Sequence, residues 1–194
     1  MSEKIITLIF GKRGSGKSFL AKKLIAGHKR YLVFDTLGEY TDGVVIESFD
    51  VLKLFWGSTY VKDFRIIYRP LNPESEFEKI CDLVWSLGNM AFLVEEVDCF
   101  CKPQSICTPF ASIIQRGRHR NITLIGVTQR PAGIARLLTS QAKQMCIFNT
   151  TEPRDVDYFR QVVGDCLVER VTALKQYEYI EWLDGREELI VKRE

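Results

Sequence analysis

One octapeptide constrains the fold of this 194-residue chain more than any other feature. Residues 11–18 read Gly-Lys-Arg-Gly-Ser-Gly-Lys-Ser and fit the pattern G-x-x-x-x-G-K-[ST]. An apolar run, residues 5–10, precedes the octapeptide directly, and a stretch with helical periodicity, residues 17–26, follows it. A strand, a glycine-rich turn and a helix in this order predict a loop whose backbone N–H groups point at phosphate oxygens.

Apolar runs and helical stretches alternate along the rest of the chain. The runs are rich in β-branched and aromatic residues, as is typical of strands buried on both faces of a parallel sheet. They cover residues 5–10, 31–34, 64–68, 91–94, 122–128 and 145–148. The helical stretches cover residues 17–26, 74–87, 109–118, 132–142 and 152–163. This alternation predicts an α/β fold with a mainly parallel central sheet.

The C-terminal segment follows a different pattern. Residues 177–182 and 188–192 read as strands, and Asp184-Gly185 between them is a favoured hairpin turn. No linker divides the chain, and its length suits one domain. We therefore expect a single domain over residues 1–194, with a β-hairpin appendage from about residue 172.

Composition excludes several classes of protein. Hydrophobic residues make up 46% of the chain and charged residues 27%, which argues against disorder. No apolar run reaches the roughly 18 to 20 residues of a membrane span, and the N-terminus lacks the pattern of a signal peptide. We therefore expect a cytoplasmic protein without a membrane span, whose six cysteines are free thiols.

Positive charge is concentrated in one part of the chain. Between Lys102 and Arg154 there are eight basic residues and one acid, Glu152, although the net charge of the whole chain is only +2. Such asymmetry favours a surface that faces an anion. A solvated face whose arginines pair with acids elsewhere is the alternative interpretation.

The octapeptide assigns roles to its residues. Lys17 is expected to reach the β- and γ-phosphates of a nucleotide, and the Ser18 hydroxyl to help coordinate Mg²⁺. We therefore predict ATP and Mg²⁺ as cofactors. The predicted binding set consists of Gly11, Lys12, Arg13, Gly14, Ser15, Gly16, Lys17, Ser18 and Phe19.

Two carboxylates follow the apolar run that ends at Val94. We expect Glu95 to bind Mg²⁺, and Glu96 to orient and deprotonate the attacking water. Asp98 is a competing candidate, and two acids that merely cap a strand end are the alternative. A carboxylate base favours hydrolysis over phosphate transfer to a hydroxyl group.

Two further stretches resemble the FtsK–HerA superfamily. Residues 35–40, Asp-Thr-Leu-Gly-Glu-Tyr, resemble the Asp-x-x-Gly-Glu-Tyr of HerA-type ATPases, and residues 116–131 resemble the superfamily stretch that ends in Thr-Gln-Arg-Pro. The resemblance covers residues 5–150 and departs at Glu95, where most such motors carry aspartate. It implies an additional-strand, RecA/FtsK-like P-loop fold. In that fold the strand that leads to Gln129 lies between the strands of the phosphate loop and the carboxylates.

The resemblance also implies roles for two more residues. Gln129 would sense the γ-phosphate, although spacing alone suggests a loop amide. Superfamily members act as rings, usually hexamers, in which an arginine reaches the nucleotide of the next subunit. Matching the family's Gly-Arg places this arginine finger at Arg118, with Arg116 and Arg120 as alternatives. Contact of these arginines with DNA phosphates or with acids is the competing interpretation.

For function, the resemblance implies an ATP hydrolase that acts as a ring motor on double-stranded DNA. The small size of the chain is typical of viral genome-packaging ATPases, with capsid or portal-vertex proteins as further partners and the host cytoplasm or the virion as location. The candidates for pore-facing cations are Lys102, Arg130, Arg136 and Lys143, which we expect on loops near the carboxyl side of the sheet. The alternatives are a filamentous-phage or secretion-type assembly ATPase that acts on protein, and a cellular conjugation or repair translocase.

Overall fold

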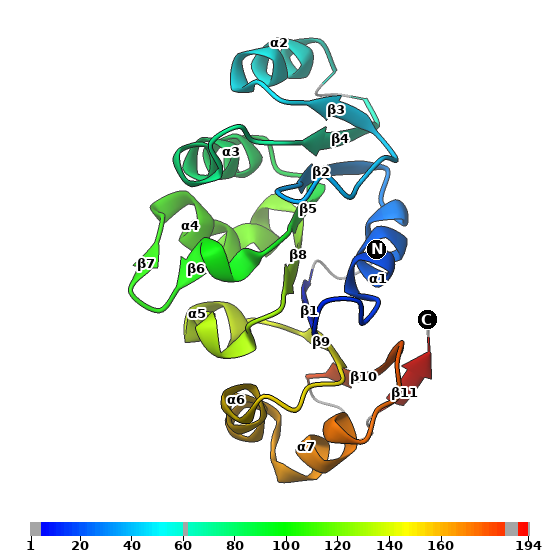
Figure 1. Ribbon diagram of the computed structural model, residues 1–194. Coiled ribbons are helices and arrows are strands. Elements are labelled where there is room, and N and C mark those ends of the chain that lie inside the picture. Colours follow the sequence, from blue (N-terminus) through cyan, green and yellow to red (C-terminus); the bar gives the residue numbers. More distant parts are fainter. Residues whose placement is uncertain (1–4, 60–61, 185–189, 194) are drawn as a thin grey trace.

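The computed structural model describes residues 5–59, 62–184 and 190–193. Its centre is a nine-stranded sheet in the order β11-β10-β9-β1-β8-β5-β2-β4-β3 (Figure 1). Neighbouring strands are parallel up to β9, and β10 and β11 add an antiparallel hairpin at one edge. The strands are β1 (Ile6–Phe10), β2 (Arg30–Phe34), β3 (Val44–Ile46), β4 (Phe64–Tyr68), β5 (Met90–Val94), β8 (Ile122–Thr128), β9 (Gln144–Phe148), β10 (Glu178–Leu183) and β11 (Ile190–Arg193). A separate two-stranded ribbon joins β6 (Cys101–Lys102) to β7 (Ser105–Ile106).

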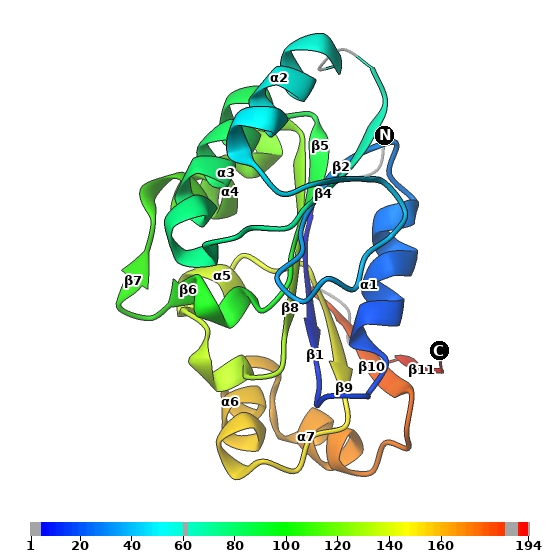
Figure 2. The ribbon, with the colours of Figure 1, turned by 45° about the horizontal axis from the view of Figure 1, so that its top comes forward.

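Helices cover the two faces of the sheet unequally. The helix α1 (Lys17–Ala26) lies on one face, and α3 to α6 lie on the other (Figures 1 and 2). The remaining helices are α2 (Phe49–Thr59), α3 (Pro73–Leu87), α4 (Thr108–Arg116), α5 (Arg136–Thr139), α6 (Pro153–Val163) and α7 (Asp165–Thr172). Short 3₁₀ turns are η1 (Val97–Cys99), η2 (Gly117–Arg120) and η3 (Pro131–Gly133).

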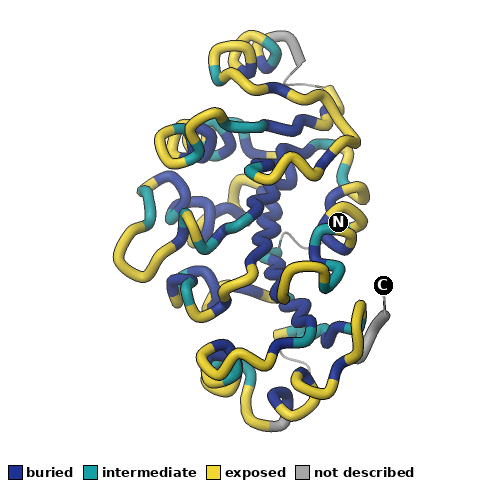
Figure 3. Tube along the Cα trace, in the orientation of Figure 1, coloured by how far each residue is buried: buried dark blue, intermediate teal, exposed yellow. Residues whose placement is uncertain are grey.

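The core follows from the alternation of side chains along each strand. In β1, Leu8 and Phe10 pack into the larger core under α3 to α7, whereas Ile9 packs against Leu20 and Ile25 of α1. All residues of β5 and β8 are buried, as Figure 3 shows along the middle of the sheet. Burial on both faces explains why these strands read as unbroken apolar runs.

The predicted fold class is confirmed. The sheet is mainly parallel, and β8 lies between β1 and β5, as the resemblance implied. The hairpin pairs Glu178 with Arg193 and Glu181 with Ile190, while residues 185–189 of its turn lie outside the described residues.

Two predicted helical stretches are wrong in detail. Residues 132–142 do not form one helix, since a 3₁₀ turn at Pro131–Gly133 and the one-turn helix α5 replace it. The stretch 109–118 ends earlier, because α4 stops at Arg116 and the chain tightens into η2 before the left-handed Asn121. Sequence periodicity also missed the three-residue strand β3 and the helices α2 and α7.

Candidate functional site

The phosphate loop, residues 11–18, has a backbone that only glycine adopts easily. Gly14 has φ +75° and Gly16 has φ +106°, both in the left-handed region. A Cβ atom on Gly11 would lie 2.6 Å from Ser15 Oγ and 2.7 Å from Phe148 Cβ. The loop is therefore folded tightly over the end of β9, and α1 begins directly behind it.

The polar groups of the loop are poised for an anion. Lys17 Nζ donates to the carbonyl of Lys12 at 2.8 Å, and burial lowers the pKa of Lys17, while Glu95 and Glu39 oppose that shift. Ser15 Oγ is buried and has no partner within the described part of the chain. An orphaned hydroxyl, a buried cation and the positive end of α1 together fit a phosphate group.

A cavity of about 460 Å³ opens at the carboxyl ends of β1, β5 and β8. Seven of the predicted site residues line it, although they come from three separate strands or loops. These are Arg13, Gly14, Lys17, Ser18, Glu95, Glu96 and Gln129. Leu37 and Glu39, which the sequence analysis gave no role, complete the wall together with Val127 and Thr128.

Glu95 is the most deeply placed acid of this cavity, with 2% of its surface exposed. Burial raises its pKa from 4.5 to about 7, and a hydrogen bond from Tyr40 opposes that shift. Tyr40 Oη donates to Glu95 Oε1 at 2.5 Å, and burial raises the pKa of Tyr40 strongly. The tyrosine therefore fixes one carboxylate oxygen and leaves the other available for a ligand.

Glu96 follows with a left-handed backbone, at φ 50°. Thr36 Oγ1 donates to its carboxylate at 3.5 Å, and the side chain is only partly buried. The competing candidate, Asp98, instead accepts a hydrogen bond from Thr128 Oγ1 at 2.6 Å and does not line the cavity. A left-handed non-glycine residue costs about 1 kcal/mol or more, and such positions cluster at functional sites. Of these two acids, Glu96 is therefore the one that lines the cavity.

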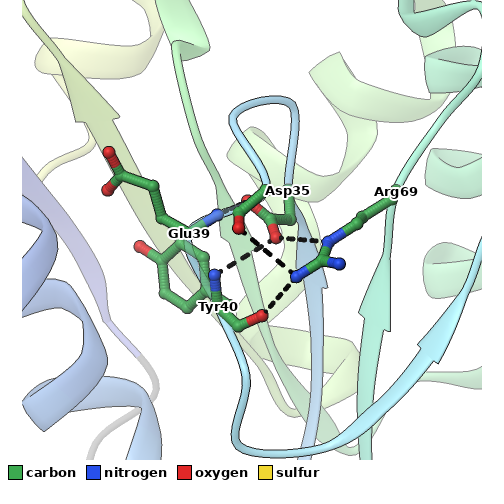
Figure 4. A network of polar contacts seen from close by, with 5 residues as sticks. Asp35, Glu39, Tyr40 and Arg69 are labelled. Atoms are coloured by element: carbon green, nitrogen blue, oxygen red, sulfur yellow. Dashed lines mark hydrogen bonds and ion pairs between the residues drawn. The ribbon is translucent and has the colours of Figure 1, made fainter.

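A polar network anchors the segment 35–40 beside these acids (Figure 4). The buried Asp35 carboxylate accepts hydrogen bonds from the backbone N–H groups of Glu39 and Tyr40, at 3.0 and 3.2 Å. Arg69 Nε donates to Asp35 at 3.1 Å, and a second guanidinium nitrogen donates to the carbonyl of Tyr40 at 2.7 Å. Sequence reasoning missed this network because Arg69 lies 34 residues from Asp35 and belongs to no local motif.

The residues predicted to hold Mg²⁺ fit a hard cation. Ser18 and Glu95 line the same cavity and offer oxygen ligands, which Mg²⁺ prefers. Within the described ranges no cluster of three His, Cys, Asp or Glu side chains could hold a metal by itself. A bound Mg²⁺ would take its remaining ligands from phosphate and water, as is usual for this ion. The five cysteines whose side chains are described are free thiols.

Gln129 and Arg118 lie at opposite ends of β8. Gln129 is exposed at the carboxyl end and lines the cavity. Arg118 lies in η2 before the amino end, and the seven residues of β8 span about 20 Å. Arg118 is therefore too far away to contact the cavity of its own chain.

The three arginines of this stretch differ in their contacts. Arg116 donates to Ser112 Oγ at 3.0 Å and lies over the Trp85 ring. Arg120 donates to the backbone carbonyl of Trp85 at 3.1 Å and to that of Ser86. Arg118 is exposed and donates only to the adjacent His119, at 3.4 Å, among the hydrogen bonds of the described residues. Of the three, it is the arginine with the greatest freedom to reach another molecule.

Other predicted residues lie apart from the cavity. Phe19 is 64% exposed on the first turn of α1 and does not line the cavity. Arg136 donates to Gln161 at 2.6 Å. Lys143 pairs with Asp184 at the amino end of β9, so the expectation that it lies near the carboxyl side of the sheet is wrong. Lys102 is exposed in the ribbon of β6.

Arg130 lines a neighbouring cavity of about 600 Å³ that shares Arg13 and Gln129 with the first. Four basic side chains line this cavity: Lys12, Arg13, Arg130 and Arg154. Two acids, Glu152 and Asp155, line it as well, and burial raises the pKa of Asp155. Two basic residues of the block between Lys102 and Arg154, Arg130 and Arg154, therefore lie beside the candidate site.

No protein-family model matches the chain, and no curated protein matches it in sequence. Solved structures do match its fold. The genome packaging NTPase B204 from Sulfolobus turreted icosahedral virus 2, in complex with AMPPCP, has a TM-score of 0.81 at 22% identity, and the match covers 100% of this chain and 99% of that one. VirB4 of Thermoanaerobacter pseudethanolicus has a TM-score of 0.72 at 12% identity, over 96% and 88% of the two chains.

A third match is the N-terminal domain of zonular occludens toxin from Neisseria meningitidis, with a TM-score of 0.58 at 14% identity over 100% and 94% of the chains. At these identities the likenesses establish the fold. They confirm, at the level of fold, the resemblance that the sequence motifs indicated. Among the residues described, no helix combines the length and the apolar character that a bilayer crossing requires.

Proposed function

We propose that this chain is an ATP-hydrolysing motor of the FtsK–HerA kind that translocates double-stranded DNA during viral genome packaging. One observation carries the ATPase part. Lys17 and Ser18 of the phosphate loop, Glu95 and Glu96 after β5, and Gln129 after β8 line a single cavity. The residues that we propose to bind phosphate, hold a metal and activate water thus follow three neighbouring strands and line one cavity.

In this proposal each residue of the cavity has a different role in hydrolysis. The loop and Lys17 would bind the β- and γ-phosphates, and Ser18 and Glu95 would hold a Mg²⁺ ion, which would supply positive charge beside the phosphate oxygens. Glu96 takes a proton from water, the water oxygen bonds to the γ-phosphorus, and the bond from that phosphorus to the bridging oxygen breaks. ADP and phosphate leave, and the amide of Gln129, which lines the cavity, would hydrogen-bond the γ-phosphate or the water.

Arg118 is proposed to act on the nucleotide of a neighbouring copy in a ring, in accord with its distance from its own cavity and its exposed guanidinium. Such a residue contributes about 10³ to 10⁵ to the rate of hydrolysis. In the assembled ring Arg118→Ala should therefore lower hydrolysis strongly while leaving nucleotide affinity unchanged, and Arg65→Ala is the matched surface control. Equal specific activity of the wild type as a dilute monomer and as an assembly would contradict the role.

DNA as the cargo is supported by the basic cavity around Arg130 and by the packaging NTPase among the fold neighbours. Contacts with backbone phosphates release counterions, so affinity for duplex DNA should fall steeply with salt. The fold likeness to the cytoplasmic domain of the Type VII secretion ATPase EccC of Thermomonospora curvata, with a TM-score of 0.63 at 12% identity, favours a second candidate, an assembly or secretion ATPase that moves protein.

One experiment tests the proposal and separates the two candidates. ATP hydrolysis is measured with and without duplex DNA across a range of protein concentrations. Stimulation by DNA and a rise in specific activity with concentration are expected for a DNA-translocating ring. Hydrolysis that does not respond to duplex DNA would favour the protein-moving candidate, and absence of hydrolysis under all conditions would contradict both.

A further inference from the structure

A third cavity, of about 280 Å³, lies on the other side of the phosphate loop. Loop residues 12–15, the end of β9 and the turn at residues 174–178 line it. It shares Arg13 and Gly14 with the site cavity. In the sheet, β9 and β10 lie on the opposite side of β1 from β5, which carries the catalytic acids. A ligand with its terminal phosphate near β5 would therefore extend across the loop toward this third cavity.

Tyr177 has an unusual backbone in the wall of this cavity. Its φ is 65°, a left-handed conformation that a tyrosine adopts only at a cost, and 43% of its surface is exposed. A tight turn holds it there, because Glu178 N–H donates to the carbonyl of Lys175 and Lys175 N–H donates to the Glu178 carboxylate. The ring reaches the phosphate loop, since a Cβ atom on Gly16 would lie 3.4 Å from Tyr177 Cδ1.

Asn149 makes the wall of the cavity rigid. Its side-chain Nδ2 donates to the carbonyls of Val171, Thr172 and Leu174, at 3.3, 3.0 and 2.9 Å. These bonds tie the C-terminal end of α7 to the end of β9, directly before the turn that carries Tyr177. An exposed aromatic ring on a strained but braced turn is preorganised to contact a ligand rather than to fill the core.

We infer that this third cavity binds the base and ribose of the nucleotide, with the Tyr177 ring stacked on a purine. The inference rests on the proposed function, because the loop must hold the phosphates of the same molecule. An aromatic ring offers a stacking platform for the π-face of a base, and a purine presents the larger face. The sequence analysis gave Tyr177 no part in nucleotide binding and regarded it only as the start of a strand.

The test compares two probes, the non-hydrolysable nucleotide AMPPCP and inorganic tripolyphosphate, by calorimetry in the presence of Mg²⁺. Tyr177→Gly removes the ring and suits the left-handed backbone, so the variant should fold. Tyr177→Phe keeps the ring. Leu54→Ala, at a 78% exposed position on α2, is the surface control.

We expect the wild type, Tyr177→Phe and Leu54→Ala to bind AMPPCP at least tenfold more tightly than tripolyphosphate. Tyr177→Gly should lose about tenfold in affinity for AMPPCP and keep the wild-type affinity for tripolyphosphate. Unchanged AMPPCP affinity in Tyr177→Gly, or an equal loss for both probes, would overturn the stacking role. A wild type that binds neither probe would instead contradict the proposed function itself.

Discussion

The phosphate loop and the acidic wall, which consists of Glu39, Glu95 and Glu96, line the same cavity but are built in different ways. The loop is a contiguous octapeptide whose groups are held by glycine conformations and by the start of α1. The acidic wall comes from two separate segments and is held by side chains through Tyr40, Asp35 and Arg69. The proposed binding element is thus encoded locally, whereas the proposed catalytic element depends on long-range contacts.

This difference separates binding from chemistry. Backbone N–H groups that point at phosphate bind the ground state and the transition state alike. A carboxylate that takes a proton from water lowers only the activation barrier of hydrolysis. Substitutions in the acidic wall should therefore lower turnover while nucleotide affinity persists. Substitutions in the loop should lower affinity.

Within the acidic wall, the largest effect is expected for Glu96→Gln. Loss of the base should lower hydrolysis by about 10² to 10⁴, with AMPPCP affinity unchanged. Lys17→Ala provides the contrast, because it should weaken nucleotide binding itself. Both are measured by steady-state hydrolysis and calorimetry, and near-normal turnover in Glu96→Gln would remove the residue from the mechanism.

A pH-dependent effect on stability is expected from Glu95. The folded protein raises the pKa of Glu95 from 4.5 to about 7, so folding favours the protonated acid. Its contribution to stability is complete below pH 4.5 and is lost as the pH rises through about 7, by up to about 3 kcal/mol. Chemical denaturation without Mg²⁺ at several pH values should show this loss in the wild type and not in Glu95→Gln. Parallel profiles of the two proteins would contradict a buried, uncharged Glu95.

Two arginines, Arg65 in β4 and Arg69 directly after it, test the support of the acidic wall. Arg69→Ala leaves the buried Asp35 carboxylate without its cation and should lower the free energy of unfolding by about 1–3 kcal/mol. Arg65→Ala breaks an exposed ion pair with Asp42 and should change it by less than about 1 kcal/mol. Urea unfolding of both variants measures these changes. Equal losses of unfolding free energy would show that the network around Asp35 stabilises the fold no more than an exposed ion pair does.

The smallest effect is expected for Tyr40→Phe. Removal of one hydrogen bond to Glu95 should raise the Mg²⁺ concentration needed for half-maximal hydrolysis by about tenfold, since the carboxylate loses its fixed orientation. Maximal turnover at saturating Mg²⁺ should stay close to that of the wild type. A Mg²⁺ titration of hydrolysis measures both values, and an unchanged requirement would leave Tyr40 a purely structural role.

The sequence predicted the parts of the molecule that depend on local pattern. The six parallel strands that it identified read as apolar runs because both faces of the sheet are covered. The octapeptide at residues 11–18 predicted the phosphate loop and the start of α1 directly. It missed β3, whose three residues are too few for a periodic signal, and it joined η3 and α5 into one helix. Periodicity cannot detect such short elements.

The candidate site shows the same limit. Glu95 and Glu96 were recognisable because they end an apolar run, and Gln129 because of the stretch around it. The roles of Tyr40, Arg69 and Tyr177 arise only in three dimensions, since a hydrogen bond across 55 residues and a left-handed tyrosine leave no local signature. Likewise, three neighbouring arginines look equivalent in the sequence, and only their contacts with α3 and α4 distinguish Arg118.

The central claim is that the cavity between the phosphate loop and the acidic wall holds a nucleoside triphosphate. A crystal structure of the protein with AMPPCP and Mg²⁺ tests it most directly. The account predicts β-phosphate oxygens within hydrogen-bond distance of the backbone N–H groups of residues 13–18, with the metal near Ser18 and Glu95. A nucleotide bound elsewhere, with the loop unoccupied and both acids facing away, would contradict it.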